Sequence, residues 1–303
     1  MKQKRQGLTL IEILVVVGII ALFVGLLLPA LSVVKNTAKE AKQKAQFNAI
    51  DIALMTFKND YGDYPPSDGW NYTSDTSLDY CGAQKLAEAL LGWDLLGFHP
   101  DSQWQADGKN SKLYRSQGID YPPDAYFFYD QLNSYDMDKR KSTYLDLGST
   151  DAFRTSGPEG LFFNSSRLNP ERFVLCDIFH RKKVAVINQI TLKTITYKAG
   201  TPILYFKANT SSNYLGSPES GSIYRIGDNR ELIGLGSVED SQMDVVQHPL
   251  FEPPDFNKFY NESIMDPKVS TIRRPWPYRP DSYILISAGA DGFYGTNDDI
   301  CNF

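Results

Sequence analysis

The sequence predicts an α+β protein in which a long N-terminal helix packs on a C-terminal head with a small antiparallel β-sheet and long loops. Three observations lead to this fold class. An unbroken apolar run covers Leu8 to Leu28, helical spacing of apolar residues continues to about residue 57, and segments with a β-type pattern occur only in the second half of the chain. The 303 residues are 42% hydrophobic and 22% charged, a globular composition sufficient for one or two domains.

The apolar run at the start of the chain has the length of a membrane span. Its 21 positions, at 1.5 Å per residue in a helix, cover a hydrocarbon core of about 30 Å. Glu12 is the one charged residue inside it. A charged residue in a membrane helix costs about 2.5–3.5 kcal/mol on insertion scales, so Glu12 requires a functional explanation.

The helical pattern continues beyond the apolar run and predicts a helix from Leu8 to Asn59, about 78 Å long. Gly62 and the Pro65–Pro66 pair end it. Two rows of apolar residues follow its surface, and the bulkier row indicates where the helix docks on the head. The small row is Val34, Ala38, Ala41, Ala45, Ala49 and Ile52; the bulkier row is Phe47, Ile50, Leu54 and Phe57.

The head combines one further helix with strands and long loops. Residues 81–98 are predicted as one helix, with Leu86, Ala89, Leu90 and Trp93 on its core face. Residues 99–170 show no sustained periodicity, and we expect long ordered loops with short elements there. Turn residues separate five segments with strand character. These segments are 172–179, 193–198, 202–209, 222–226 and 282–289.

Charge and cysteine content exclude several classes of protein. The net charge is −5, and about −8 without Met1–Gly7, so we expect no nucleic-acid partner. Cys81, Cys176 and Cys301 lie far apart without a C-x-x-C pair, which leaves zinc and redox motifs unsupported. If the head is exported, one disulfide plus one free thiol remains an open alternative.

No catalytic motif is present, and we predict that the protein is not an enzyme, with no catalytic residues. His99, His180 and His248 have no partner at ligand spacing. The sequence contains no G-x-S-x-G, no Walker loop and no G-x-G-x-x-G. A signal-anchored periplasmic enzyme stays the weakest alternative.

The N-terminus allows three interpretations. A cleaved secretory signal has a shorter apolar region and a small-x-small site, and a plain signal anchor explains neither Glu12 nor Gly7. The third interpretation explains both. The segment "RQGLTLIEILVVVGIIALFVGLLLPAL" resembles the type III signal of prepilins and pseudopilins. The resemblance implies that a prepilin peptidase cuts after Gly7 and methylates Leu8, with Glu12 and Pro29 as assembly positions. Leu8 departs mildly from the usual phenylalanine or methionine.

The resemblance gives Glu12 a role. Cleavage creates an α-amino group on Leu8, which is protonated at neutral pH because its pKa is about 7.7–8.0. Glu12 would pair with that group on a neighbouring subunit. In the alternative, Glu12 extends to the lipid headgroups and has no partner in assembly.

The end of the chain carries a second candidate site, "SYILISAGADGFYGTNDDICNF". Asp291, Asn297, Asp298 and Asp299 lie on a glycine-rich loop, and clustered oxygen ligands of this kind suit Ca²⁺. The spacing does not match an EF-hand, and an acidic surface turn is the alternative. The segment resembles the C-terminal loop of major pseudopilins from type II secretion systems, where calcium holds this loop. The resemblance implies a calcium site at these four residues.

Both ends together imply a pseudopilin subunit of a type II secretion-like filament that drives protein export. The implied organisation is a leader (1–7), a transmembrane and stalk helix (8–59) and a periplasmic head (60–303), a pilin-like lollipop anchored once in the bacterial inner membrane. Its partners would be the prepilin peptidase, identical or related pseudopilin subunits, the inner membrane and the secretion assembly platform. The alternative is a minor type IV pilin that acts as a binding module for adhesion or DNA uptake. The middle region, 70–270, exceeds the compact head usual for the family.

Overall fold

The computed structural model describes most of the chain and divides it into two compact units, Met1–Lys42 and Gln43–Phe303. Side chains at 26, 28–30, 32–33, 134–136 and 220 lie outside the description. The described residues are 10–68, 79–102, 104–106, 129, 134–148, 150–187, 191–216, 219–240, 245–251, 256–271 and 274–303.

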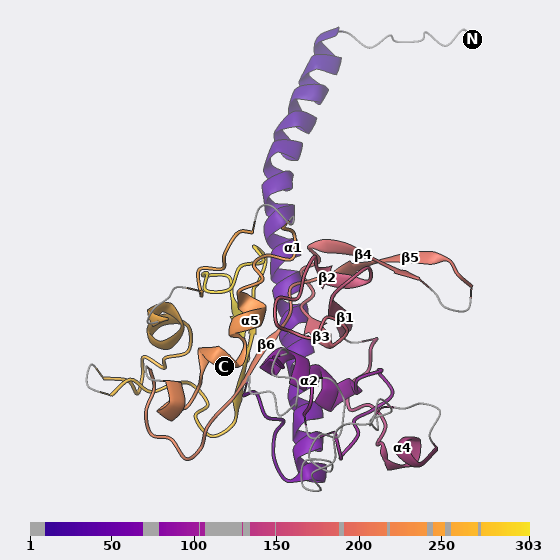
Figure 1. Ribbon diagram of the computed structural model, residues 1–303. Coiled ribbons are helices and arrows are strands. Elements are labelled where there is room, and N and C mark those ends of the chain that lie inside the picture. The colour runs from indigo at the N-terminus through magenta and orange to yellow at the C-terminus, as the bar shows by residue number, and fades with distance from the viewer. Residues whose placement is uncertain are drawn as a thin grey trace, which may run out of the picture. The chain divides into compact units, whose positions relative to one another are not determined.

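Helix α1 runs from Leu10 to Tyr61, so the predicted long helix is confirmed and ends two residues later than Asn59 (Figure 1). From Leu10 to Gly25 its side chains are exposed on all sides and, apart from Glu12, apolar, with Leu10 at 82% and Leu14 at 64%. The prediction of a membrane span concerns this part of the helix. Among the described residues, no helix has both the length and the apolar character to cross a membrane.

In the second unit, α1 buries the bulkier apolar row. Phe47, Ile50, Leu54 and Phe57 are at most 2% exposed, which confirms the predicted docking face. Their neighbours in the core come from α2 (Gly82–Leu91) and from the strands that cross beside it. The small row is exposed except for the half-buried Ala49, and Ile52 at its end is 66% exposed.

Among the described residues the β-structure forms three small sheets, so the prediction of one small antiparallel sheet is wrong in number. Antiparallel pairing occurs in each, but β1 and β2 pair in parallel. The sheets have the orders β2-β1-β3, β4-β5 and β6-β7-β8. The strands are β1 (Asp151–Ser156), β2 (Gly160–Phe162), β3 (Phe173–Cys176), β4 (Lys182–Ile187), β5 (Thr194–Ala199), β6 (Leu204–Lys207), β7 (Tyr283–Ser287) and β8 (Ile300–Cys301).

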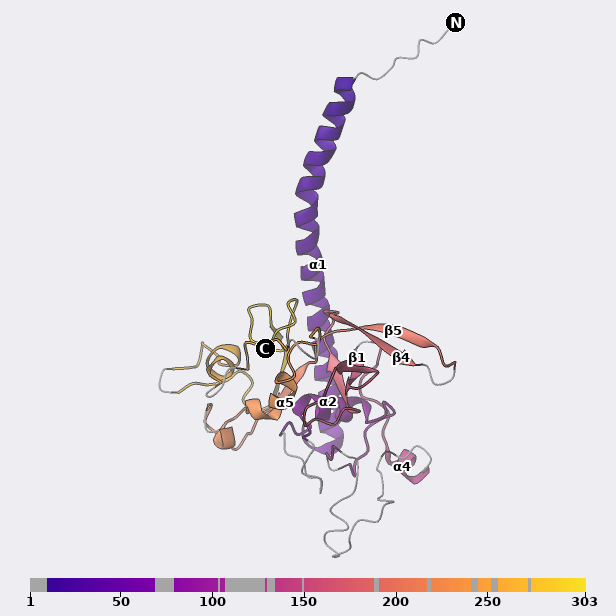
Figure 2. The ribbon, with the colours of Figure 1, turned by 45° about the horizontal axis from the view of Figure 1, so that its top comes forward.

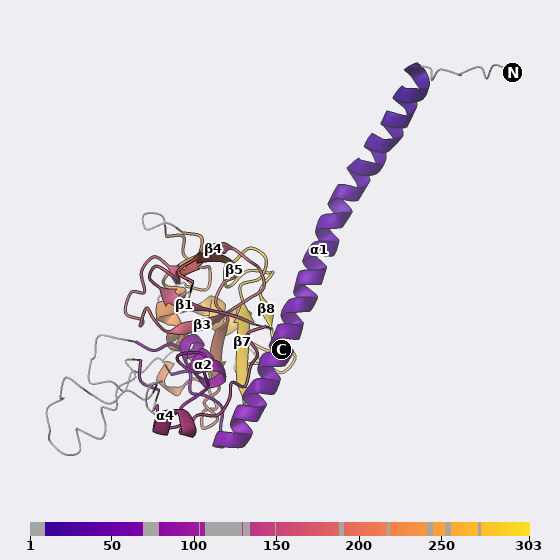
Figure 3. The same cartoon turned by 90° about the vertical axis from the view of Figure 1, so that its right-hand side faces the viewer.

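The C-terminal strands lie against the part of α1 that belongs to the second unit (Figure 3). Asp51 on this helix receives a hydrogen bond of 2.7 Å from the Tyr283 hydroxyl and one of 3.2 Å from the Asn302 side-chain amide. Arg279 approaches the same carboxylate at 3.4 Å. Polar contacts therefore fix the chain end to the helix beside the apolar core.

Several local predictions require correction. The helix predicted at 81–98 ends at Leu91, because Gly92 takes a φ of +84° that a continuing helix does not allow. Residues 222–226 form no strand; Ser222 makes an isolated bridge to Tyr214 and a 3₁₀ turn follows. The remaining short helices are α4 (Ser134–Lys139), α5 (Arg230–Ile233), the 3₁₀ turns Glu219–Gly221 and Ile226–Asp228, and a π-type turn at Lys258–Ser263.

The three cysteines are free thiols. Cys81 and Cys176 are buried in the core, and Cys301 is half-buried at the end of β8. Burial raises the pKa of the Cys81 thiol to about 12. The open alternative of a disulfide is therefore absent from the structure.

Two isoleucines on the same helix allow a matched test of the docking face. We expect Ile50→Ala to lower the free energy of unfolding by about 2–5 kcal/mol, because a fully buried side chain leaves a cavity. Ile52→Ala, the same change at an exposed position, should stay within about 0.5 kcal/mol. Denaturant unfolding of the detergent-solubilised chain, followed by tryptophan fluorescence, measures both. Equal effects of the two substitutions would contradict the docking face.

Candidate functional site

The N-terminal motif falls largely outside the described residues. Gly7 and Leu8 precede them, and the side chain of Pro29, which lies within α1, is not described. Glu12 lies in the first turn of α1, where a carboxylate interacts favourably with the helix dipole. The structure leaves the predicted roles of these four residues untested.

The surface of α1 in the first unit has a clear physical consequence. Every described side chain from Leu10 to Gly25 is exposed, and Glu12 is the one charged residue in this range. A helix that is apolar on all sides requires an apolar environment, from lipid or from other helices. Such a surface is consistent with a segment that packs against partners.

The C-terminal loop connects β7 to β8 and brings two of the predicted ligands together. The Asp291 backbone N–H donates to Asp298 Oδ2 at 2.8 Å, and the Thr296 hydroxyl donates to Asp298 Oδ1 at 2.5 Å. Gly289 has a φ of +62°, and a Cβ there would lie 2.0 Å from the Asp298 carbonyl oxygen. The tight return of this loop therefore requires glycine at position 289.

The other carboxylates of the loop also bind backbone N–H groups. Asp291 Oδ1 accepts from Phe293 at 2.8 Å, and Asp299 Oδ2 accepts from Gly295 at 2.7 Å. Among the described residues, Asp299 Oδ1 is buried and has no hydrogen-bond partner. Burial raises the pKa of Asp299 to about 7.

Asp291 and Asp298 differ in acidity although they are neighbours. Burial raises the pKa of Asp291, and the nearby Asp298 adds to this. For Asp298, burial also acts to raise the pKa, but hydrogen bonds from Thr296 and from the Asp291 backbone outweigh it and lower the pKa. The pKa values of these two neighbouring carboxyl groups are therefore shifted in opposite directions.

The donor set fits a calcium ion only in part. Over the described part of the chain, no group of three or more His, Cys, Asp or Glu residues is arranged to hold a metal ion. Asn297 lines a hollow of about 480 Å³ together with Asp299 and Glu262. The buried Asp299 oxygen has no hydrogen-bond partner among the described residues, and a bound cation would satisfy it.

Asp177 lies beneath the loop and connects it to the core. Its carboxylate accepts from the Ser287 hydroxyl at 2.9 Å and from the Thr201 backbone N–H at 3.0 Å. The Ser287 hydroxyl in turn accepts from the Gly289 N–H at 3.2 Å. Burial raises the pKa of Asp177 to about 7, against the effect of these hydrogen bonds. The base of the loop is therefore held by a buried carboxyl group.

His248 supports the same loop from the other side. Its Nδ1 accepts from the Tyr294 backbone N–H at 3.2 Å, and its ring packs on the Tyr294 ring. Burial lowers the pKa of His248 to about 4, so the ring is neutral at physiological pH. These contacts give His248 a structural role.

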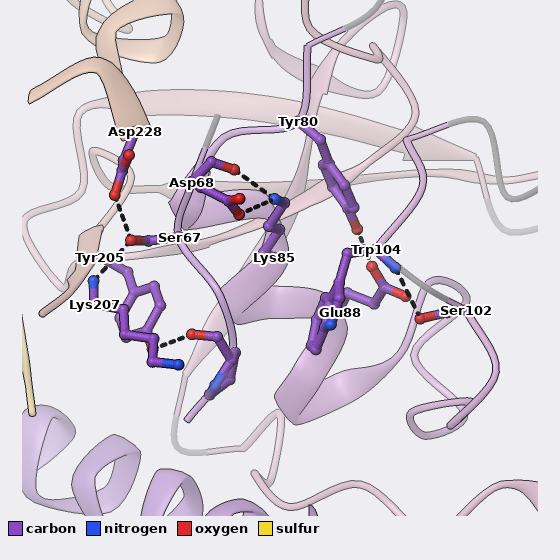
Figure 4. A network of polar contacts seen from close by, with 11 residues as sticks. Ser67, Asp68, Tyr80, Lys85, Glu88, Ser102, Trp104, Tyr205, Lys207 and Asp228 are labelled. Carbon is purple, nitrogen blue, oxygen red and sulfur yellow. Dashed lines mark hydrogen bonds and ion pairs between the residues drawn. The ribbon is translucent and has the colours of Figure 1, made fainter. Parts of the chain in front are cut away.

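A buried polar network around α2 was not foreseen from the sequence (Figure 4). Lys85 Nζ pairs with Asp68 Oδ1 at 2.9 Å, and Glu88 accepts from the hydroxyls of Tyr80 and Tyr129, the latter at 2.8 Å. Burial raises the pKa of Glu88. The spacing of apolar residues in α2 predicts one buried face. In the structure all ten residues of α2 are buried, including Lys85 and Glu88.

A second part of this network joins distant segments. Ser67 donates to Asp228 at 2.5 Å and accepts from the Lys207 backbone N–H at 2.8 Å. Figure 4 shows Ser67 between these two partners. Burial raises the pKa of Asp228 to about 7. Because these polar groups bind one another, they position the loop before α2 against β6.

Comparison with known proteins identifies the N-terminal segment. Residues 2–28 match the family model described as the prokaryotic N-terminal methylation motif. This motif is the prepilin-type signal, so it supports a membrane-anchored protein of the type IV pilin-like class that is processed by a prepilin peptidase. No curated protein and no solved structure matches the chain.

The buried carboxyl groups predict how stability depends on pH. Asp177 keeps its proton up to about pH 7 in the folded protein but releases it near pH 4 when unfolded, so its contribution to stability is full below pH 4 and is lost as the pH rises through 7. His248 acts in the opposite direction at low pH, but it is common to all variants. We expect Asp177→Asn to reduce the fall in unfolding free energy between pH 5 and 8. Thermal and denaturant unfolding across this range measure the slope.

Asp138→Asn, at an exposed position of α4, is the control for this experiment. It should show the wild-type slope. Identical slopes for Asp177→Asn and wild type would show that the carboxyl beneath the loop does not hold a proton at neutral pH.

Proposed function

We propose that this chain is a pseudopilin, a subunit of a type II secretion-like filament that assembles from the inner membrane and drives protein export. The observation that carries the proposal is the methylation motif at residues 2–28, with Gly7, Leu8 and Glu12 at the spacing of a prepilin signal. The proposed role is mechanical, and the subunit acts by assembly rather than by catalysis.

The chemistry of the N-terminus supports assembly through α1. Cleavage after Gly7 frees the α-amino group of Leu8, which carries a positive charge at neutral pH. Glu12 on a neighbouring subunit supplies the opposite charge. Removal of one member of a buried ion pair typically costs about 3–5 kcal/mol, so the pair favours one register between subunits. The exposed apolar surface of Leu10–Gly25 supplies the remaining contact area.

A calcium ion in the C-terminal loop is the second part of the proposal. The support is the acidic loop of Asp291, Asn297, Asp298 and Asp299 and the unpartnered oxygen of Asp299. In the described conformation, backbone N–H groups bind the loop carboxylates. A bound calcium ion would neutralise the negative charge of these carboxylates instead. Asp298 would exchange those hydrogen bonds for the ion.

One observation favours the alternative, a minor pilin that binds a surface or DNA. The β4–β5 hairpin exposes Tyr197 together with Lys183 and Lys198. Basic and aromatic side chains on one hairpin are typical of a recognition surface. The N-terminal motif serves both candidates equally.

The role of Glu12 provides the experiment that tests assembly. We expect Glu12→Gln to leave membrane insertion intact, because the substitution removes a costly charge, and to reduce incorporation into filaments at least about tenfold. Co-expression with a type II secretion assembly system, followed by shearing and immunoblotting, measures incorporation. Glu40→Gln, an exposed carboxylate later in α1, is the control and should assemble normally. Normal assembly of Glu12→Gln would leave Glu12 with contacts to lipid headgroups only.

Calcium binding predicts a gain in thermal stability. A ligand that binds only the folded state at a hundredfold excess over Kd stabilises it by about 2.7 kcal/mol. The protein should therefore melt several degrees higher in Ca²⁺ than in chelator, with a smaller effect of Mg²⁺, which demands octahedral geometry. Asp291→Ala should remove the difference. A melting temperature that does not respond to millimolar calcium would leave an acidic turn without a metal.

A further inference from the structure

The β4–β5 hairpin is the most isolated element of the second unit. Lys183 lies opposite Lys198, and Val184 lies opposite Tyr197 in its register. Figures 1 and 2 show that the hairpin extends away from the other two sheets. Within the described chain β5 pairs with β4 alone, so its outer edge presents unpaired backbone groups. We refer to the described residues 182–187 and 191–199 together as the hairpin arm.

The arm exposes apolar side chains that the fold does not use. Every residue from Thr191 to Lys198 is exposed, with Leu192 at 78%, Tyr197 at 48% and Ile195 at 41%. Strand β4 is anchored to the rest of the unit by Val184 at 2%, by the half-buried Val186 and by the Ile187 N–H, which donates to Glu159 at 2.8 Å. Strand β5 is anchored at its end, where Ala199 is 0% exposed. An isolated two-stranded hairpin is marginally stable in water. A surface of this kind is expected to gain order from a partner.

The charge around the arm is unlike that of the rest of the chain. Residues 178–218 contain six Lys and Arg residues and no Asp or Glu, so the remainder carries a formal charge of −11, against −5 for the whole. Residues 219–303 contain 14 Asp and Glu against seven Lys and Arg. The chain therefore holds a basic and an acidic region that are complementary.

Part of this complementarity is already satisfied within one chain. Arg181, at the base of the arm, approaches Glu239 at 3.6 Å. Lys183, Lys193 and Lys198 lie farther along the arm and are exposed, and no ion pair with them is found among the described residues. Exposed carboxylates remain in the acidic region. They include Glu262, Asp281 and Asp291.

We propose that the hairpin arm docks on exposed carboxylates within residues 219–303 of a second copy of this chain, among them Glu262, Asp281 and Asp291. The lysines would pair with carboxylates, and Tyr197 and Leu192 would become buried at the contact. Because the arm and its target are different regions of the molecule, the contact is heterologous and repeats from copy to copy, as a filament requires. The inference rests on the proposed function for its place in a filament.

A nucleic-acid partner fits the charges less well than a second copy. A polyanion at the arm would meet three lysines, but it would be repelled by the −11 charge on the rest of the chain. An acidic protein surface carries fewer charges at lower density. The observations therefore favour the second copy, and binding to DNA or to anionic lipid is an outcome that the experiments must separate.

Site-specific photocrosslinking tests the contact directly. The full chain, purified in detergent, would carry p-benzoylphenylalanine in place of Tyr197 or, as a control, in place of Leu96, an exposed residue outside both regions. We expect a crosslinked dimer from Tyr197 and little from Leu96, with the captured peptide within residues 219–303. Equal crosslinking from both positions, or capture of the arm itself, would overturn the proposal.

Charge reversal tests the role of the lysines. We expect the triple variant Lys183→Glu, Lys193→Glu, Lys198→Glu to weaken self-association in analytical ultracentrifugation by about tenfold or more, whereas the triple Lys→Arg variant associates as wild type. The matched control reverses Lys35, Lys42 and Lys44, which are exposed and lie outside both regions, to Glu. It makes the same change in net charge and should not weaken association. Raising the salt from 50 to 500 mM should reduce the difference between wild type and the Glu variant.

The outcomes separate this inference from the proposed function. If the Glu variant associates as wild type, or if it loses binding to a labelled oligonucleotide or to phosphatidylglycerol vesicles and keeps self-association, the inference is wrong. The pseudopilin assignment then still stands on processing and on Glu12. Suppose instead that the protein associates through the arm in a salt-sensitive manner but is never cleaved after Gly7. The arm contact would then be supported, and the pseudopilin assignment would be overturned.

Discussion

The burial of the Phe47–Phe57 face of α1 is the interaction on which the second unit depends. Phe47, Ile50 and Leu54 enter one core with α2 and with strands from two different sheets, and Phe57 packs beside it against Ala89 of α2 and Phe98. Each buried side chain of this size contributes about 1.5–3 kcal/mol, so the face makes a large contribution to the stability of the unit. The polar contacts of Asp51 with Tyr283 and Asn302 then fix the chain end to the same helix.

This core also supports the C-terminal loop. The C-terminal loop begins at the end of β7, and β7 packs in the core shared with α1. Asp177 and His248 hold the loop from below through Ser287 and Tyr294. The loop is therefore linked to the core through these contacts. A ligand that binds the loop carboxylates should change the free energy of unfolding of the whole second unit.

The sequence was informative where a periodic pattern or a motif determined the structure. The long helix and its docking face follow from residues spaced at three and four positions, and four of the five predicted segments contain the strands β3, β5, β6 and β7. Strands β1, β2, β4 and β8 lie outside these segments. Strands β2 and β8 have only three and two residues, too few to show an alternating pattern. The pairing of Lys85 with Asp68 and of Glu88 with Tyr129 could not be predicted, since burial of charged residues is decided by tertiary contacts.

The predicted calcium ligands also show how little the sequence says about individual side-chain contacts. Asp291 and Asp298 are adjacent as expected, but their oxygens bind backbone N–H groups and a hydroxyl in the described conformation. Spacing alone cannot distinguish an oxygen that binds a metal from one that closes a turn. The uneven distribution of charge between residues 178–218 and 219–303, in contrast, can be read from the sequence, but its meaning depends on the exposed arm.

Intact-mass and peptide mass spectrometry of the membrane-extracted protein tests the central claim most directly. The prepilin-type motif at residues 2–28 predicts a mature chain that begins at Leu8 with one methyl group on its amine. Gly7→Val, which presents a β-branched residue to the peptidase, should abolish this form. A wild-type chain that retains Met1 in a cell with an active prepilin peptidase would contradict the account.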